Sequence, residues 1–121
     1  MTNEQAASRF EHDYECYENV AATIGVIGGK WKMLIMWHVN QGSIRYNELR
    51  RSIPGISQKM LSQQLKELEQ DGIIHREVYP ETPPRVEYNI TDYGHTLDPI
   101  FDLMDAWGET HRQTVGRGRT P

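Results

Sequence analysis

The chain has 121 residues, enough for one domain, and a mean hydropathy of −0.69. No apolar run approaches the roughly 18 residues that a membrane span requires, and the polar residues 1–5 do not resemble a targeting signal. A single cysteine excludes an intrachain disulfide framework. We therefore expect a cytoplasmic protein with no membrane partner.

The net charge of −4 is unevenly distributed along the chain. Residues 1–29 hold one arginine and five acidic residues, and residues 91–121 hold three basic and five acidic residues. Residues 43–66 carry five basic residues and only one acidic residue, Glu48. A local positive patch is what phosphate binding requires, so the acidic total does not exclude a DNA partner.

The N-terminal third of the chain predicts two helices. We expect a flexible segment at residues 1–12 and a first helix at residues 17–27, which ends at a glycine pair. A second helix is expected at residues 30–40, before Gly42. It is strongly apolar and should be the central core helix.

Residues 43–71 predict a helix-turn-helix unit. After a short strand or extended link at residues 43–45, a third helix is expected at residues 46–52, followed by a Pro-Gly turn. Ser57 is a good N-cap for a fourth helix that ends at Asp71-Gly72.

The fourth helix is amphipathic. Leu61, Leu65 and Leu68 fall at i, i+4 and i+7, which places them on one buried stripe. The opposite face carries amide, hydroxyl and ammonium groups, without a carboxylate until Glu67. Such a face fits the donor and acceptor pattern of the DNA major groove.

Beyond Gly72 the residue pattern changes from helical to alternating. Two alternating runs, at residues 74–79 and 85–90, flank a proline-containing loop and predict an antiparallel hairpin. Thr91 is expected to cap a last helix at residues 92–111. The tail at residues 114–121 is expected to be disordered.

A helix-turn-helix followed by a hairpin indicates a mostly α, α+β winged helix-turn-helix fold. The helix at residues 57–71 would enter the major groove, and the wing at residues 76–90 would lie near the minor groove. We expect adenine contacts from two glutamines, a guanine contact from a lysine, phosphate contacts from three arginines and a minor-groove contact from Arg85. The full predicted DNA-binding set is Arg45, Asn47, Arg50, Arg51, Ser57, Gln58, Lys59, Ser62, Gln63, Lys66 and Arg85.

A series of ordered motifs resembles the signature of HxlR-type transcriptional regulators over residues 16–108. These motifs are Ile27-Gly28-Gly29-Lys30-Trp31, Arg45-Tyr46-Asn47-Glu48-Leu49, Ile53-Pro54-Gly55-Ile56-Ser57-Gln58-Lys59-Met60-Leu61, Gln64-Leu65, Leu68-Glu69-Gln70-Asp71-Gly72, Tyr79-Pro80, Pro83-Pro84, Val86-Glu87-Tyr88 and Thr91-Asp92-Tyr93-Gly94. The resemblance implies an HxlR-type domain at residues 13–113 that regulates nearby operons as a homodimer built from the first and last helices.

The sequence agrees with a dimer, because the apolar stripe of the last helix is too wide for a terminal element to hide alone. The predicted interface is Tyr17, Val20, Ile24, Leu97, Ile100, Phe101, Met104 and Trp107. The other interpretation is that Met104 and Trp107 pack on their own domain.

Cys16 occupies the family's N-terminal cysteine position, just ahead of the first helix. The resemblance implies a response to oxidants or electrophiles, in which the lone cysteine pairs with its twin or with a small thiol. Its neighbours Asp13, Glu15 and Glu18 disfavour a thiolate, and the alternative is a small, half-buried apolar side chain.

Two other functional classes compete with this interpretation. One is a regulator triggered by a small ligand between the dimer helices, in a pocket lined by Trp31, Trp107 and Tyr17. The other is a winged-helix module that binds a polypeptide. The histidines do not have the spacing of metal ligands, and the sequence contains no recognisable catalytic triad or carboxylate pair. We therefore expect that the protein binds no cofactor or metal and is not an enzyme.

Overall fold

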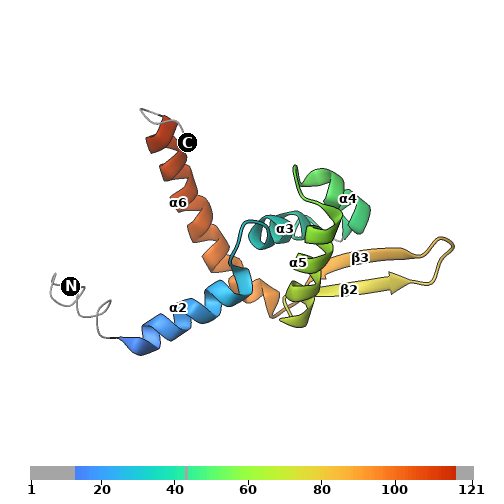
Figure 1. The fold of residues 1–121 in the computed structure, drawn as a ribbon, viewed down its shortest axis with the longest axis horizontal. Coiled ribbons are helices and arrows are strands. Elements are labelled where there is room, and N and C mark those ends of the chain that lie inside the picture. Colours follow the sequence, from blue (N-terminus) through green and yellow to red (C-terminus); the bar gives the residue numbers. More distant parts are fainter. Residues whose placement is uncertain (1–12, 43, 117–121) are drawn as a thin grey trace.

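A computed structural model describes residues 13–42 and 44–116. The elements in chain order are α2 (Tyr14–Ile27), α3 (Lys32–Val39), β1 (Ile44–Arg45), α4 (Tyr46–Ser52), α5 (Gln58–Gln70), β2 (Ile74–Tyr79), β3 (Arg85–Ile90), the 3-10 turn η1 (Gly94–Leu97) and α6 (Asp98–Gly116). The strands form an antiparallel sheet in the order β1-β3-β2. Figure 1 shows α2 and α6 projecting as two arms from a central unit, with the hairpin extending on the far side.

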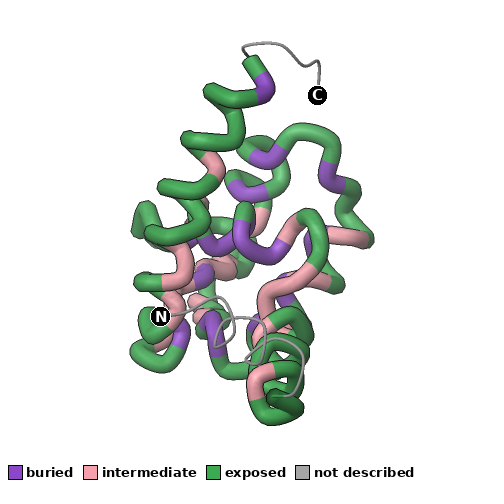
Figure 2. The backbone as a smooth tube through the Cα atoms, turned by 90° about the vertical axis from the view of Figure 1, so that its left-hand side faces the viewer, coloured by how far each residue is buried: buried purple, intermediate pink, exposed green. Residues whose placement is uncertain are grey.

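The core lies between α3, α4, α5 and the sheet. The buried cluster includes Ile35 and Val39 of α3, Leu49 of α4, Leu61 of α5 and Tyr88 of β3. Figure 2 shows buried positions concentrated in the centre of the molecule, whereas the helix that leads to the C-terminus is almost entirely exposed. The winged helix-turn-helix fold is therefore confirmed.

The turn between α4 and α5 follows from its sequence. Gly55 adopts a φ of +82°, a conformation that side chains disfavour. Ser57 then caps α5 as predicted, because its hydroxyl accepts a hydrogen bond from the Met60 backbone amide at 3.0 Å. The predicted leucine stripe is confirmed, since Leu61, Leu65 and Leu68 are all buried.

The prediction for the last helix was wrong at both ends. Thr91 caps the 3-10 turn instead, because its hydroxyl accepts from the Gly94 amide at 2.8 Å and donates to the Gly72 carbonyl at 2.6 Å. Gly94 must be glycine here, since a Cβ would collide with the Ile73 carbonyl. As a result α6 begins only at Asp98, and it continues to Gly116.

Three further boundaries differ from the prediction. The first helix begins at Tyr14, because the Asp13 carboxylate accepts from the Cys16 backbone amide at 2.9 Å and caps it. The core helix is shorter than expected at both ends. The tail prediction was wrong for residues 114–116, which are helical. The predictions for residues 1–12, 43 and 117–121 lie outside the described residues.

Among the described residues, no single helix is long and apolar enough to cross a membrane. Only α2 and α3 taken together, which meet at 62°, reach that length and composition.

Candidate nucleic-acid interface

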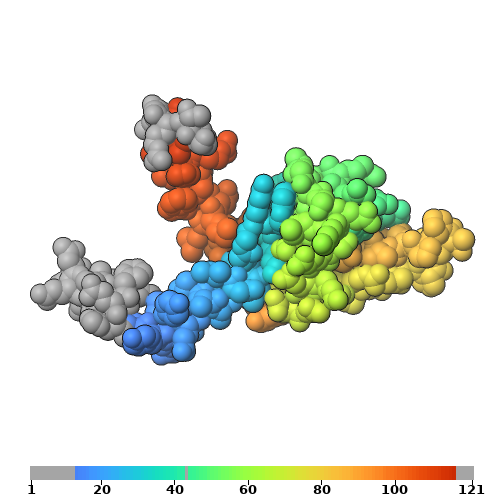
Figure 3. All heavy atoms as spheres, in the orientation of Figure 1, coloured from blue at the N-terminus to red at the C-terminus, as the bar shows by residue number. Residues whose placement is uncertain are grey.

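The exposed face of α5 carries the predicted reading residues. Gln58, Lys59, Ser62, Gln63 and Lys66 are all exposed, on the side of the helix opposite its buried leucines. This face combines amide, hydroxyl and ammonium groups, which match the hydrogen-bonding edges of base pairs. Figure 3 shows α5, in green, on the outer surface of the central unit.

Polar contacts from two residues, Tyr46 and Lys32, fix the orientation of α5. The Tyr46 hydroxyl donates to the Gln58 carbonyl at 3.2 Å and lies 2.8 Å from Ser62 Oγ. On the inner side, the Lys32 ammonium donates to Glu67 Oε1 at 3.3 Å, and Lys32 is 6% exposed. A buried ammonium requires such a partner, so this ion pair ties α5 to α3.

Ser57 and Ser62 are thus partly committed to local structure. Ser57 is the N-cap of α5, and the Ser62 hydroxyl lies beside Tyr46. Sequence patterns anticipated the cap, but they did not indicate the Tyr46 contact, which joins residues 16 positions apart. Tyr46 is therefore a positioning residue that the sequence interpretation missed.

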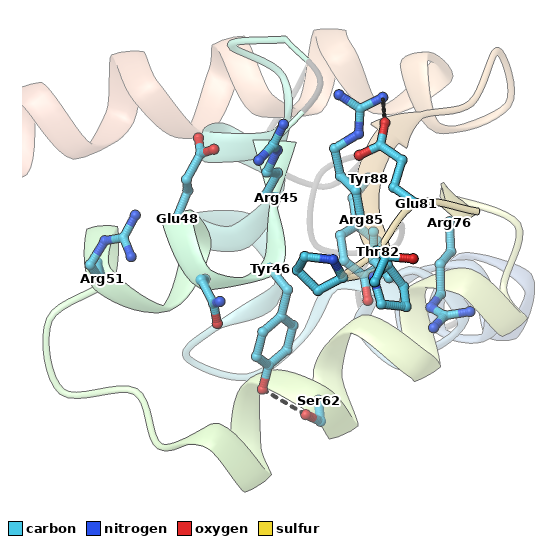
Figure 4. A pocket seen from close by; sticks show the side chains of 14 residues that line it. Arg45, Tyr46, Glu48, Arg51, Ser62, Arg76, Glu81, Thr82, Arg85 and Tyr88 are labelled. Carbon is cyan, nitrogen blue, oxygen red and sulfur yellow. Dashed lines mark hydrogen bonds and ion pairs between the residues drawn. The ribbon is translucent and has the colours of Figure 1, made fainter. Parts of the chain in front are cut away.

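A cleft of about 780 Å³ separates α4 from the wing (Figure 4). Arg45 and Arg51 lie on the α4 side with Asn47 and Glu48, and Arg76 and Arg85 lie on the wing side. Four arginines and two glutamates, Glu48 and Glu81, therefore line the cleft. The predicted Arg50 is exposed on α4 but does not line this cleft.

Arg85 is engaged within the wing. Its guanidinium lies 3.3 Å from Glu81 Oε1 and 3.1 Å from Glu87 Oε2, and its Cζ is 4.0 Å from the centre of the Tyr79 ring. The side chain is only 28% exposed. The predicted minor-groove contact would require this arginine to leave two carboxylates, and that contact stays a prediction.

Arg76 was absent from the predicted set, yet it lies between the wing and α5. It pairs with Tyr88 across the β2–β3 ladder and lines both the large cleft and a smaller hollow beside Ser62, Lys66 and Glu69. Burial raises the pKa of Tyr88 above 10.0, although the nearby Arg76 guanidinium opposes the shift.

The predicted interface residues divide into two groups. Tyr17, Val20 and Ile24 are exposed on α2, which has no buried residue, and Met104 and Trp107 are exposed on α6. Leu97 and Phe101 instead pack against the core, and Leu97 belongs to η1 rather than to the last helix. Leu103, which is 70% exposed, was missed, although its position between Ile100 and Trp107 extends the same stripe.

Cys16 lies in the first turn of α2 rather than ahead of it, and it is a partly exposed free thiol.

The aromatic residues suggested for a ligand pocket are dispersed. Trp31 packs against the core, whereas Tyr17 and Trp107 are exposed on different arms. Within the described residues, no group of three or more His, Cys, Asp or Glu side chains is arranged to hold a metal ion.

Together, the hairpin, the helix pair and the exposed polar face of α5 define a winged helix-turn-helix DNA-binding protein. The chain belongs to the HxlR-like helix-turn-helix family, whose model matches residues 26–115. The protein is accordingly a transcriptional regulator. The matched range begins after Cys16, so the family model itself does not cover the cysteine.

Relatives and solved structures agree with this assignment. The chain is 52% identical over 96 residues to YybR of Bacillus subtilis, an uncharacterized HTH-type transcriptional regulator; the match covers 79% of this chain and 77% of YybR. The reduced form of the redox regulator HypR is 50% identical, with a TM-score of 0.77, over 82% of this chain and 98% of HypR. The reduced form of the transcriptional regulator YodB from B. subtilis is 41% identical, with a TM-score of 0.68, over 75% and 89%.

Proposed function

We propose that this regulator binds a specific duplex DNA sequence as a homodimer, with α5 of each protomer in the major groove. The observation that carries the proposal is the division of α5 into a buried leucine stripe and an exposed polar face, held in place by Tyr46 and Lys32. The two half-sites would lie about one helical turn apart.

The predicted residues take two roles. Gln58, Lys59 and Gln63 would contact base edges, with Ser57, Ser62 and Lys66 beside them on the same helix. Arg45, Asn47, Arg50 and Arg51 would contact phosphates and fix the register without reading sequence. The exposure of both groups on adjoining elements supports this division.

Salt dependence of binding tests the proposal directly. If the dimer makes ~6–10 phosphate contacts, affinity for duplex DNA should fall by ~10³–10⁵ between 50 and 200 mM salt. A gel shift with random duplex at low salt, followed by a salt titration, measures this. A flat response or no binding would contradict the proposal and favour a module that binds a polypeptide.

The homodimer is supported by the exposed apolar faces of the two arms. On α6, Ile100, Leu103, Met104 and Trp107 line an apolar hollow of about 350 Å³. An exposed apolar surface of this kind indicates an interaction site, and the arms diverge from the central unit, where a second copy has room to pack (Figure 3). Self-association would bury the apolar faces of both arms without altering α5.

Redox control through Cys16 is a second part of the proposal, favoured by the similarity to a redox regulator. Since the chain has one cysteine, any disulfide it forms joins it to a second molecule. The partly exposed thiol lies on α2, so such a bond would alter an arm that is proposed to form the dimer. Diamide treatment should alter operator affinity of the native chain but not of Cys16→Ser. Equal responses of the two proteins would contradict this part alone.

A further inference from the structure

The wing carries two arginines with different surroundings. Arg76 on β2 and Arg85 on β3 both line the cleft, and both are attached to the same two-stranded ribbon. A sequence pattern cannot distinguish them, because each is a lone arginine in an alternating run. Their cross-strand partners do distinguish them.

The register places them on opposite faces of the sheet. Ile44, Tyr88 and Arg76 lie in one row across the three strands, and Arg45, Glu87 and Glu77 lie in the next row. Arg85 is two residues from Glu87 on β3, so it shares the face of Glu87. Successive residues of a strand point to opposite faces. Because Tyr88 is buried against the helices, Arg76 shares the face that is turned toward them.

The electrostatic partners also differ. Arg85 lies within ion-pair distance of Glu81 and Glu87, which offset its positive charge. Arg76 lies beside the neutral phenol of its cross-strand neighbour Tyr88, which cannot neutralise its charge. A guanidinium has five N–H donors in a fork that matches phosphate oxygens, so Arg76 has donors for a phosphate.

The surroundings of Arg76 point to the DNA backbone as its ligand. Ser62 and Lys66 of the proposed reading face line the same hollow, and Glu69 is the one carboxylate among the described residues that line it. Arg51 of α4 lines the larger cleft together with Arg76 (Figure 4). A strand whose bases meet α5 would therefore have its phosphates between α4 and the base of the wing.

Resting on the proposed function, we propose that Arg76 is the wing's phosphate-binding residue, and that Arg85 maintains the shape of the wing through Glu81 and Glu87. The cleft between α4 and the wing then holds one phosphodiester backbone, with Arg51 on one wall and Arg76 on the other. DNA binding leaves the Arg85 ion pairs intact.

The test measures how the binding constant for random duplex DNA depends on salt, by fluorescence anisotropy with the full chain. Each phosphate contact contributes ~0.9 to the slope of log K against log salt, so Arg76→Gln should reduce the slope by about 1.8 in a dimer. The double variant Arg85→Gln/Glu81→Gln keeps the net charge and should keep the slope. Arg112→Gln, on α6 far from the wing, removes one positive charge as a matched control and should also keep it.

A second readout separates phosphate contact from a general effect on folding. In a scan with neutral methylphosphonates, the native protein should lose affinity at one phosphate per half-site where Arg76→Gln does not. Arg76→Lys should retain that sensitivity, because the charge remains, and it serves if the glutamine variant does not fold.

The outcomes distinguish the two levels of the proposal. If the native protein shows no salt-dependent DNA binding, the proposed function fails and this assignment with it. If native binding is steep but Arg76→Gln keeps the slope, or the Arg85→Gln/Glu81→Gln pair lowers it by about 1.8, only the assignment of the wing arginines is overturned.

Discussion

The central unit and the two arms differ in where their apolar side chains lie. In the central unit, α3, α4, α5 and the sheet bury most of their large aliphatic residues against one another, and Ile35, Leu49 and Leu61 are fully buried. In the arms, α2 buries none of its residues, and Trp107 of α6 is 68% exposed. The central unit therefore buries most of its apolar side chains by itself, whereas the arms leave most of theirs exposed.

This difference assigns separate roles to the two regions. A self-contained unit holds α5 and its polar face in fixed geometry, which binding to base edges requires. Arms with exposed apolar faces would gain stability from the proposed second copy. Changes in the centre should therefore affect folding, and changes in the arms should affect assembly.

The largest effect is expected in the centre. Leu61→Ala should lower the free energy of unfolding by about 2–5 kcal/mol, because the fully buried side chain leaves a cavity between α5 and the core. Urea denaturation at fixed protein concentration measures this. Leu34→Ala on α3, where the leucine is 49% exposed, is the matched control and should cost at most about 1 kcal/mol. Equal losses would show that α5 is not part of a single packed core.

In the arms, Trp107→Ala should weaken self-association by about 30-fold, the equivalent of a 2 kcal/mol loss at an interface hot spot. The exposed indole borders the apolar hollow of α6, so its removal reduces the area that a second copy would bury. Sedimentation equilibrium measures the dissociation constant. Glu109→Ala on the same helix should leave it unchanged, and a native protein that stays monomeric would refute the role of the arms.

The contrast between local and long-range contacts also explains what could be predicted from the sequence. The leucine stripe of α5, its Ser57 cap and the alternating hairpin are signals within a few residues, and all three are confirmed. The prediction was wrong at Thr91, because its hydroxyl donates to the carbonyl of Gly72, 19 residues away, and caps a 3-10 turn instead of the last helix. Pro99 was the local signal for the later start of α6, since proline fits the first turn of a helix.

For the candidate site, residue types could be predicted but not their partners. The exposed face of α5 follows from helical periodicity alone. The ion pairs of Arg85 depend on the turn that brings Glu81 back to it, and the position of Arg76 depends on the pairing of β2 with β3. The division of the apolar stripe, with Phe101 on the core and Leu103 exposed, depends on where α6 leaves the central unit.

A smaller and more selective effect is expected on the reading face. Gln63→Ala should relax the preference at one base pair by about 1–3 kcal/mol, because an exposed amide on α5 is removed without disturbing the buried stripe. Arg51→Ala should weaken binding to all sequences alike, since the side chain lines the cleft that is proposed to hold the phosphate backbone. Selection from a random DNA pool compares the two. An unchanged base preference for Gln63→Ala would remove this residue from the reading set.

The smallest effect concerns the buried phenol between the wing and the helices. Burial raises the pKa of Tyr88 in the folded protein above 10.0, so its contribution to stability is fully present below pH 10 and is lost as the pH rises through the folded pKa. Tyr88→Phe should therefore show a shallower loss of unfolding free energy in alkaline solution than the native chain. Tyr14→Phe, which removes an exposed phenol on an arm, should retain the native pH dependence. If Tyr88→Phe loses stability as steeply as the native chain, the alkaline sensitivity does not arise at the base of the wing.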